Sequence, residues 1–141
     1  CLLNQIVPEP MAMLQAVDEL GASVVADDLA CCGRRLYPAG TSHDPFTRMA
    51  ESLLGGPPDS TRESPIQARL DHLLGMARST GARGVVFYDV KFCEPELFDL
   101  PRLRRHLGEA GYPLLHVEVE LSGTLSQQTL TRLEAFVETL R

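Results

Sequence analysis

The sequence predicts one α/β domain, a three-layer arrangement in which a four-stranded, mostly parallel sheet is flanked by helices on both faces. Short apolar or β-branched segments alternate with longer segments in which apolar residues recur every three or four positions, as in helices. Gly and Pro separate most of these segments. The length of 141 residues, with 44% hydrophobic and 23% charged residues, fits a single globular domain over 1–141.

The first predicted strand covers residues 2–7 and ends at the prolines that follow. A helix comes next, with Gly21 placed to end it and with an apolar stripe at Met11, Leu14, Val17 and Leu20. Residues 22–26 are short and β-branched, which is typical of a strand buried on both faces, and they run into Asp27 and Asp28.

Residues 31–42 are rich in Gly, Pro and Arg and are predicted to form a loop. Asp44-Pro45 is a favourable helix start, and the helix is expected to turn one face to the core: Phe46, Met49, Ala50, Leu53 and Leu54. Ser64-Pro65 begins another helix, expected to end near Gly81, with its core stripe at Ile66, Leu70, Leu73, Leu74 and Ala77.

The rest of the chain repeats the alternation. A strand is predicted over 85–88, a helix over 96–110 with Pro101 interrupting its first turn, and a strand over 114–119. Ser122 and Thr124 are candidate N-caps for a last helix, whose apolar positions are Leu130, Leu133, Phe136, Val137 and Leu140.

Charge and motif content exclude several function classes. The 19 acidic against 13 basic residues give a net charge of −6, and such a surface repels the phosphates of nucleic acids. No apolar run approaches the roughly 18 residues that a membrane-spanning helix needs, and no basic segment precedes the first apolar one as in a signal peptide. Dinucleotide, P-loop and hydrolase-elbow motifs are absent from the sequence. We therefore expect a cytoplasmic protein whose four cysteines are reduced thiols or metal ligands rather than disulfides. The start at Cys1 suggests the C-terminal domain of a longer subunit.

Polar and thiol groups follow the predicted strands. Ligands of parallel sheets bind beyond the carboxyl ends of the strands, so a site is expected where these segments meet. Cys93, between Phe92 and Glu94, is either a metal ligand or nucleophile facing that crevice, or a small buried hydrophobic residue. Cys31 and Cys32 are adjacent and lack the spacing of a redox pair, but they are expected to follow a strand that neighbours the one before Cys93.

Charged residues at the same edge have alternative roles. Asp27 and Asp28 can bind a divalent cation or accept a proton, or they can cap a turn by accepting backbone N–H groups. Lys91 and the pair Arg34-Arg35 can contact an anionic ligand or can simply be solvated. The four histidines show no spacing typical of metal ligands.

The order and spacing of four segments resemble one family. Residues 91–101, KFCEPELFDLP, are similar to its K-F-C-[DE]-P-x-x-F-[DE]-x-P segment, and GYPLL at 111–115 followed by Glu118 resembles its G-[IV]-P-[VT]-L-x-x-E strand. The last helix is similar to its G-Q-x-x-T-R-[IL]-E-A-F-x-E ending, and VVADD at 24–28 resembles its strand with an acidic pair. The family is that of 2-hydroxyacyl-CoA dehydratases, including the 2-hydroxyglutaryl-CoA dehydratase D-component, and benzoyl-CoA reductases.

The resemblance implies the C-terminal, Rossmann-like or flavodoxin-like domain of an iron–sulfur subunit. It implies a [4Fe–4S] cluster, single or double-cubane, with Cys93 as a ligand and Cys31 and Cys32 as secondary candidates; the other ligands come from an N-terminal domain. The cluster delivers a low-potential electron to a CoA thioester in anaerobic metabolism, for dehydration or for ring reduction. The implied partners are an acyl-CoA, a homologous second subunit and an ATP-dependent iron–sulfur activator protein. Lys91, Asp28 and Arg34 are the candidate substrate contacts.

Two departures from the family pattern concern these residues. The loop after the acidic pair has two cysteines and two arginines where the family often has one Cys and a Gly-Ser-Arg-like loop, and Gln127 replaces a family Gly. Two other interpretations of the chain stay open. One is a non-catalytic scaffold of the same fold, and the other is a receiver-like phospho-acceptor or divalent-metal module using Asp27, Asp28 and Lys91.

Overall fold

A parallel sheet forms the centre of the molecule in the computed structural model, which describes residues 2–5, 10–120 and 124–141. Its strands are β1 (Leu2–Gln5), β2 (Ala26–Leu29), β3 (Val85–Val90) and β4 (Leu114–Val119), paired in the order β2-β1-β3-β4. The helices are α1 (Met11–Glu19), α2 (Pro45–Leu54), α3 (Ile66–Thr80), α4 (Glu94–Glu109) and α5 (Gln127–Thr139), with short 3-10 turns η1 (Gly33–Arg35) and η2 (Ser60–Arg62). The prediction of a mixed α/β domain with a parallel sheet is confirmed. Predictions for Ile6, Val7 and Ser122 lie outside the described residues.

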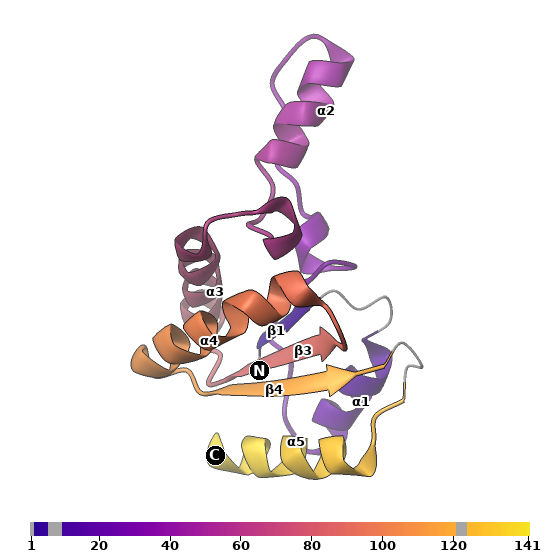
Figure 1. Cartoon of the computed structure of the whole chain (residues 1–141), viewed down its shortest axis with the longest axis vertical. Coiled ribbons are helices and arrows are strands. Elements are labelled where there is room, and N and C mark those ends of the chain that lie inside the picture. The colour runs from indigo at the N-terminus through magenta and orange to yellow at the C-terminus, as the bar shows by residue number, and fades with distance from the viewer. Residues whose placement is uncertain (1, 6–9, 121–123) are drawn as a thin grey trace.

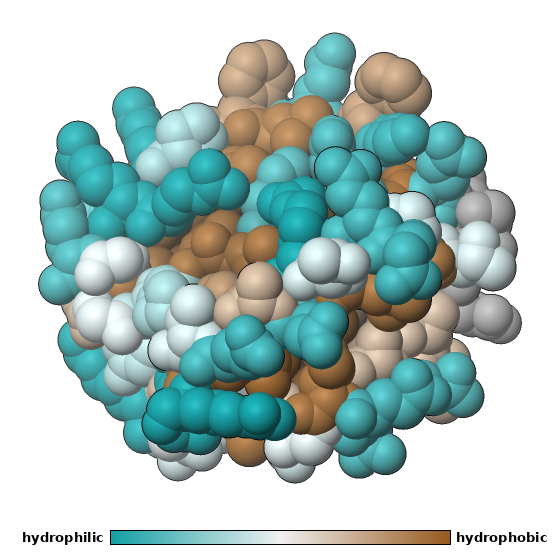
Figure 2. Space-filling view, turned by 90° about the horizontal axis from the view of Figure 1, so that it is seen from below, coloured by the Kyte–Doolittle hydropathy of each residue, from teal (hydrophilic) through white to brown (hydrophobic). Residues whose placement is uncertain are grey.

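Helices cover both faces of the sheet (Figure 1). The alternation of side chains along β3 sends Val86 and Tyr88 into a core shared with α1 and α5, while Val85 and Phe87 enter a second core shared with α3 and α4. These four side chains are at most 1% exposed, as expected for a strand inside a parallel sheet. Figure 2 shows the outer surface on the α5 side, where teal polar side chains surround brown apolar patches.

Two glycines end helices as the sequence predicts. Gly81 closes α3 and Gly21 follows α1, and both have left-handed backbone conformations, with φ of 68° and 69°. Such a conformation costs glycine little because it has no Cβ. Each turn brings the chain back toward the sheet.

The second strand begins later than predicted. Residues 22–25 connect α1 to the sheet, and β2 starts at Ala26, where backbone pairing with Leu2 begins. The apolar run therefore crosses between layers, and the acidic pair at 27–28 lies within the strand. Helix α4, by contrast, begins at Glu94, two residues earlier than predicted. The predicted interruption at Pro101 was wrong: the helix continues through Pro101, since the burial of Leu100, Leu103 and Leu107 against α3 offsets one lost backbone hydrogen bond.

Helix α2 forms an arm that projects from the body of the molecule (Figure 1). Its N-cap is Asp44, as predicted, with Oδ2 accepting the Thr47 N–H at 2.7 Å. The predicted core face was wrong, because no residue of α2 is buried. The exposed fractions of Phe46 and Leu54 are 82% and 85%, and those of Met49 and Leu53 are 62% and 51%. Apolar periodicity predicts that a helix has one apolar face, but it does not show whether another element packs against that face.

The arm is held by its polar groups. Glu51 Oε2 accepts the backbone N–H groups of Thr41 at 2.7 Å and Ser42 at 3.0 Å, and Ser52 Oγ donates to the Pro38 carbonyl at 2.6 Å. Arg62 donates to the Leu53 carbonyl at the other end of the arm. Within the described ranges, no helix is long and apolar enough to cross a membrane.

Candidate functional site

The carboxyl end of β3 carries the thiol that the sequence singled out. Cys93 is half-buried and lies at the N-cap of α4, and its N–H donates to the Val90 carbonyl at 3.1 Å. Phe92, just before it, has a left-handed backbone with φ of 68° and is 88% exposed. A bulky residue in that conformation is strained, and such strain persists where the surroundings fix the chain.

The ionisation of Cys93 reflects its surroundings. Burial raises the pKa of the Cys93 thiol, and the carboxylates of Asp89 and Glu96 act in the same direction. The backbone N–H of Glu96 and the charge of Arg34 oppose this rise without cancelling it. The pKa is therefore above its ordinary value, and the free thiol is protonated at neutral pH.

Lys91 lies on the exposed side of the same turn. Its Nζ is 2.9 Å from Glu120 Oε1, and this hydrogen bond raises the pKa of Lys91. Together with Glu118, Ser126 and Thr129, Lys91 lines a hollow of about 300 Å³ between the end of β4 and the start of α5. Glu120 lines the same hollow, so an anionic group entering it would meet the Lys91 ammonium group together with the carboxylates of Glu118 and Glu120.

The cysteine pair follows β2. Cys31 is half-buried against the α1 and α5 core, Cys32 is exposed, and their sulfur atoms are 3.5 Å apart without a disulfide. The expectation that the strands before this pair and before Cys93 are neighbours was wrong, because β1 lies between β2 and β3. Strand order depends on the tertiary structure, and spacing along the chain does not reveal it.

The acidic pair has two separate roles. Asp27 Oδ1 accepts the N–H groups of Leu29 at 3.1 Å and Gly33 at 2.7 Å, the turn-capping role that was one alternative for this pair. A Cβ on Gly33 would lie 2.1 Å from the Asp27 carbonyl oxygen, so only glycine fits there. Asp28 is 2% exposed, and its Oδ2 lies 3.1 Å from Arg34 Nε.

Arg34 is the centre of a buried ion-pair network. The side chain is 3% exposed, and its Nη1 lies 3.1 Å from Glu96 Oε1 and 3.6 Å from Asp59 Oδ2. Burial alone would lower the pKa of Arg34, but the carboxylates of Asp28, Glu96 and Asp59 outweigh it and raise the pKa. Arg34 and Asp28, both predicted as substrate contacts, thus face protein groups.

The network continues into α3 and α4. Arg69, 1% exposed, pairs through Nη2 with Glu96 Oε2 at 2.7 Å and through Nη1 with Asp99. His72 Nε2 lies 3.3 Å from Asp28 Oδ1. Sequence reasoning missed Glu96, Arg69, Asp99 and Asp59, although an arginine beside Leu70 on the core stripe of a helix was a signal for a buried pair.

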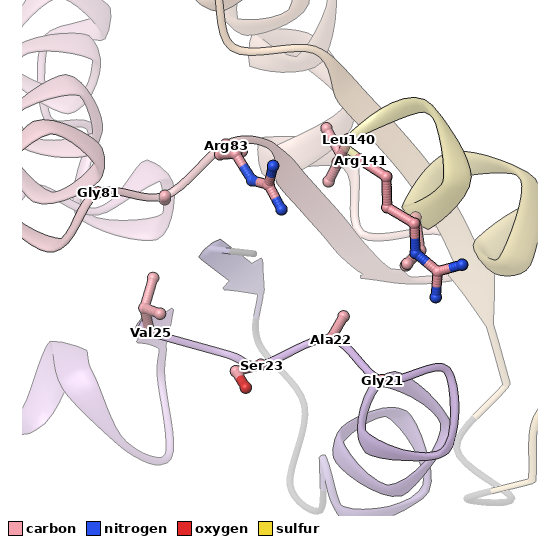
Figure 3. A pocket seen from close by; sticks show the side chains of 10 residues that line it. Gly21, Ala22, Ser23, Val25, Gly81, Arg83, Leu140 and Arg141 are labelled. Atoms are coloured by element: carbon pink, nitrogen blue, oxygen red, sulfur yellow. The ribbon is translucent and has the colours of Figure 1, made fainter.

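The two edges of the sheet differ electrostatically. A hollow of about 290 Å³ at the amino-terminal edge is flanked by Arg83 and Arg141 (Figure 3). Helices α1, α3 and α5 end there, at Leu20, Gly81 and Leu140, and helix C-termini carry partial negative charge. Arg141 Nη2 donates to the Leu20 carbonyl at 2.9 Å, so this arginine complements the C-terminal end of α1. The positive helix N-termini lie at the other edge, with Cys93 and Ser126.

The described residues contain no group of three or more His, Cys, Asp or Glu side chains arranged to hold a metal ion. Cys93, Cys31 and Cys32 therefore do not form a complete metal centre by themselves. The ligand roles predicted for them stay predictions, and any centre at Cys93 needs further ligands.

Comparisons with known proteins agree on one enzyme family. The family model of the 2-hydroxyglutaryl-CoA dehydratase D-component matches residues 2–140. The chain is 30% identical over 138 residues to the (R)-phenyllactyl-CoA dehydratase beta subunit of Clostridium sporogenes, covering 96% of this chain and 36% of that protein. It is 32% identical over 141 residues to the lactoyl-CoA dehydratase subunit beta of Anaerotignum propionicum, covering 99% and 38%.

A third relative is the (R)-2-hydroxyglutaryl-CoA dehydratase subunit beta of Acidaminococcus fermentans, 24% identical over 149 residues, with coverage of 99% and 38%. The chain thus spans between a third and two fifths of the length of these relatives.

Proposed function

The chain belongs to the 2-hydroxyglutaryl-CoA dehydratase D-component family, and on this premise we propose that it is part of an enzyme subunit that removes water from a 2-hydroxyacyl-CoA thioester. The observation that carries the proposal is the family match over residues 2–140. The named relatives act on phenyllactyl-, lactoyl- and 2-hydroxyglutaryl-CoA, which share a hydroxyl group next to the thioester carbonyl. Ring reduction of the benzoyl-CoA type is the second reaction that the sequence resemblance implied.

We infer that the chain is the C-terminal, Rossmann-like domain of a longer subunit. In support, it spans 36–38% of its relatives, and helices lie on both faces of its parallel sheet. All three relatives are named beta subunits, which supports a companion subunit as a partner. An ATP-dependent activator protein, expected from the sequence resemblance, is part of the same proposal.

Cys93 is the residue that we assign to an iron–sulfur cluster. A half-buried thiol at a helix N-terminus on the carboxyl edge is a suitable donor, and the described residues supply no complete metal-binding group around it. The remaining ligands are then expected from the rest of the subunit. When bound, a [4Fe–4S] cluster would supply a low-potential electron for the thioester.

The residues around Cys93 set the conditions for ligation. Because burial raises the thiol pKa, iron must displace a proton, and cluster binding is expected to weaken as the pH falls. Lys91 is the solvent-facing cation nearest in sequence, and we propose that it contacts the phosphates of the CoA group. Direct substrate roles for Arg34 and Asp28 stay predictions. Both side chains are buried and paired with each other, so a substrate would have to displace this ion pair to reach them.

The test uses the complete subunit that carries this chain, purified without oxygen together with its companion subunit. Iron and acid-labile sulfide are measured in the wild type, in Cys93→Ser and in Ser79→Ala, a control at an exposed position of α3. We expect stoichiometric iron in the wild type and the control, with loss of iron and of 2-hydroxyacyl-CoA dehydration in Cys93→Ser. Undiminished iron in Cys93→Ser would remove the ligand assignment, and negligible iron in all three would favour the scaffold interpretation.

A further inference from the structure

We propose that Glu96 is a positioning residue for Cys93: held between Arg34 and Arg69, it fixes the first turn of α4 against the segment after β2. The proposal rests on the proposed function for one point, the ligand role of Cys93. The contacts that support it are all within this chain.

The Glu96 carboxylate is held on both oxygens. Its side chain is fully buried, with Oε1 at 3.1 Å from Arg34 Nη1 and Oε2 at 2.7 Å from Arg69 Nη2. The two guanidinium groups come from different elements, η1 and α3. Charge-assisted hydrogen bonds are short and directional, so the carboxylate has one orientation and its backbone is anchored with it.

The backbone of Glu96 is connected directly to Cys93. The N–H groups of Glu96 and Leu97 donate to the Cys93 carbonyl at 3.2 and 3.1 Å and close the first turn of α4. On the other side, the chain enters through Phe92 with its positive φ. This entry is strained, so the contacts of Glu96 are needed to hold Cys93 in place.

Arg34 carries this anchoring across the sheet edge. Strand β1 separates β2 from β3, so no backbone pairing joins the segment after β2 to the segment after β3. Arg34 spans the gap, since it also binds Asp28 at the end of β2 at 3.1 Å. On the α3 side, Arg69 binds Asp99 in the second turn of α4. The Cys31-Cys32 segment and the start of α4 are thereby held in one arrangement.

Ion pairs of this kind define geometry more than they stabilise. Taking charges out of water offsets most of their mutual attraction, and apolar residues of similar volume often stabilise a core equally well. Apolar side chains would not specify the orientation of the first turn of α4 so narrowly. A role in positioning accounts for several buried charges beside a thiol at the proposed site.

The test measures how firmly Cys93 is held in the metal-free chain. The variants are Glu96→Gln and the charge-balanced double variant Glu96→Gln with Arg34→Met, and Leu133→Ala in α5 is the control. Leu133 is fully buried but belongs to the other core, so its truncation lowers stability without touching the network. The readouts are amide hydrogen exchange over residues 93–97 and alkylation of Cys93 by iodoacetamide. The alkylation rate is compared with that of free N-acetylcysteine in the same mixture, because Cys32 itself caps the η1 turn that carries Arg34.

We expect exchange over 93–97 to rise about tenfold in the folded Glu96 variants, which is about 1.4 kcal/mol of local opening. Alkylation of Cys93 should rise similarly in the charge-balanced double variant. In Glu96→Gln alone, alkylation does not measure opening, because losing a carboxylate that raises the Cys93 pKa speeds the reaction by itself. Leu133→Ala should leave both local rates within about twofold after correction for its global stability. If Glu96→Gln does not fold, the double variant decides, and if neither folds, Arg34→Lys does. That variant keeps the charge but loses the planar fork that reaches both carboxylates.

Wild-type rates in the folded variants, or an equal rise in Leu133→Ala, would overturn the positioning role. This outcome is distinct from failure of the proposed function, which is decided by iron retention in Cys93→Ser. The alkylation and exchange experiments require no cluster.

Discussion

Substitution of Arg69 tests how much the buried ion-pair network contributes to the stability of the fold. The guanidinium is 1% exposed and binds fully buried Glu96 at 2.7 Å and also Asp99, which is 24% exposed. Breaking a buried ion pair by removing one partner costs about 3–5 kcal/mol, because the other charge stays buried. In Arg69→Met, Glu96 keeps Arg34 and Asp99 can gain water, which favours the lower end of that range.

We therefore expect Arg69→Met to lower the free energy of unfolding by about 3 kcal/mol, measured by urea denaturation followed by circular dichroism. For a domain of this size, each kcal/mol corresponds to roughly 2–4 °C in Tm, so the midpoint should fall by about 6–12 °C.

The matched control is Arg105→Met. Arg105 is 70% exposed, with Nε 3.8 Å from Glu109, and its loss should cost less than about 0.5 kcal/mol, as for most exposed pairs. If Arg69→Met lowers the free energy of unfolding by less than about 1 kcal/mol, or if both variants lower it by similar amounts, the reasoning is refuted that each buried charge of the network needs its partner for stability.

Three further predictions concern other parts of the chain. Gly33→Ala should destabilise by about 2 kcal/mol or more, because its Cβ would lie 2.1 Å from the Asp27 carbonyl oxygen; wild-type stability in urea would contradict this. Phe46→Ser on the α2 arm should change the free energy of unfolding by less than about 0.5 kcal/mol, as its side chain is 82% exposed, and a core-like loss of ~3 kcal/mol would show that the face is covered. The pKa of Asp59 is lowered, because hydrogen bonds from Thr61 and the charge of Arg34 outweigh the effect of burial. Its contribution to stability is therefore complete above the ordinary carboxyl pKa and is lost as the pH falls through the lower folded-state value. Asp59→Asn should accordingly make acid unfolding, followed by fluorescence or circular dichroism, less steep below about pH 4.

The proposed site and the positioning network account for different parts of the carboxyl edge. Cys93 and Lys91 lie where a ligand can reach them, whereas Arg34, Glu96 and Arg69 lie beneath the surface. Substitutions in the first group should change iron content and substrate turnover. Substitutions in the second group should change the rate of local opening in the first turn of α4. The two groups can therefore be separated experimentally.

Much of the fold was predictable from local patterns. The span of β4, the N-cap at Asp44 and the glycine that ends α3 agree with the structure, because each depends on residues close together in the sequence. The expected segment around Cys93 was likewise recognisable, since a thiol directly after a buried strand of a parallel sheet lies at the carboxyl edge.

The tertiary structure alone decided the rest. Periodicity gave α2 an apolar face but could not show that no other described element packs on it, and strand spacing did not reveal that β1 separates β2 from β3. The sequence predicted Arg34 as a loop residue that contacts an anionic substrate or is solvated, yet it pairs with Glu96, 62 positions further along the chain. Charge pairing over such separations depends on how the layers pack, and a local pattern carries no record of it.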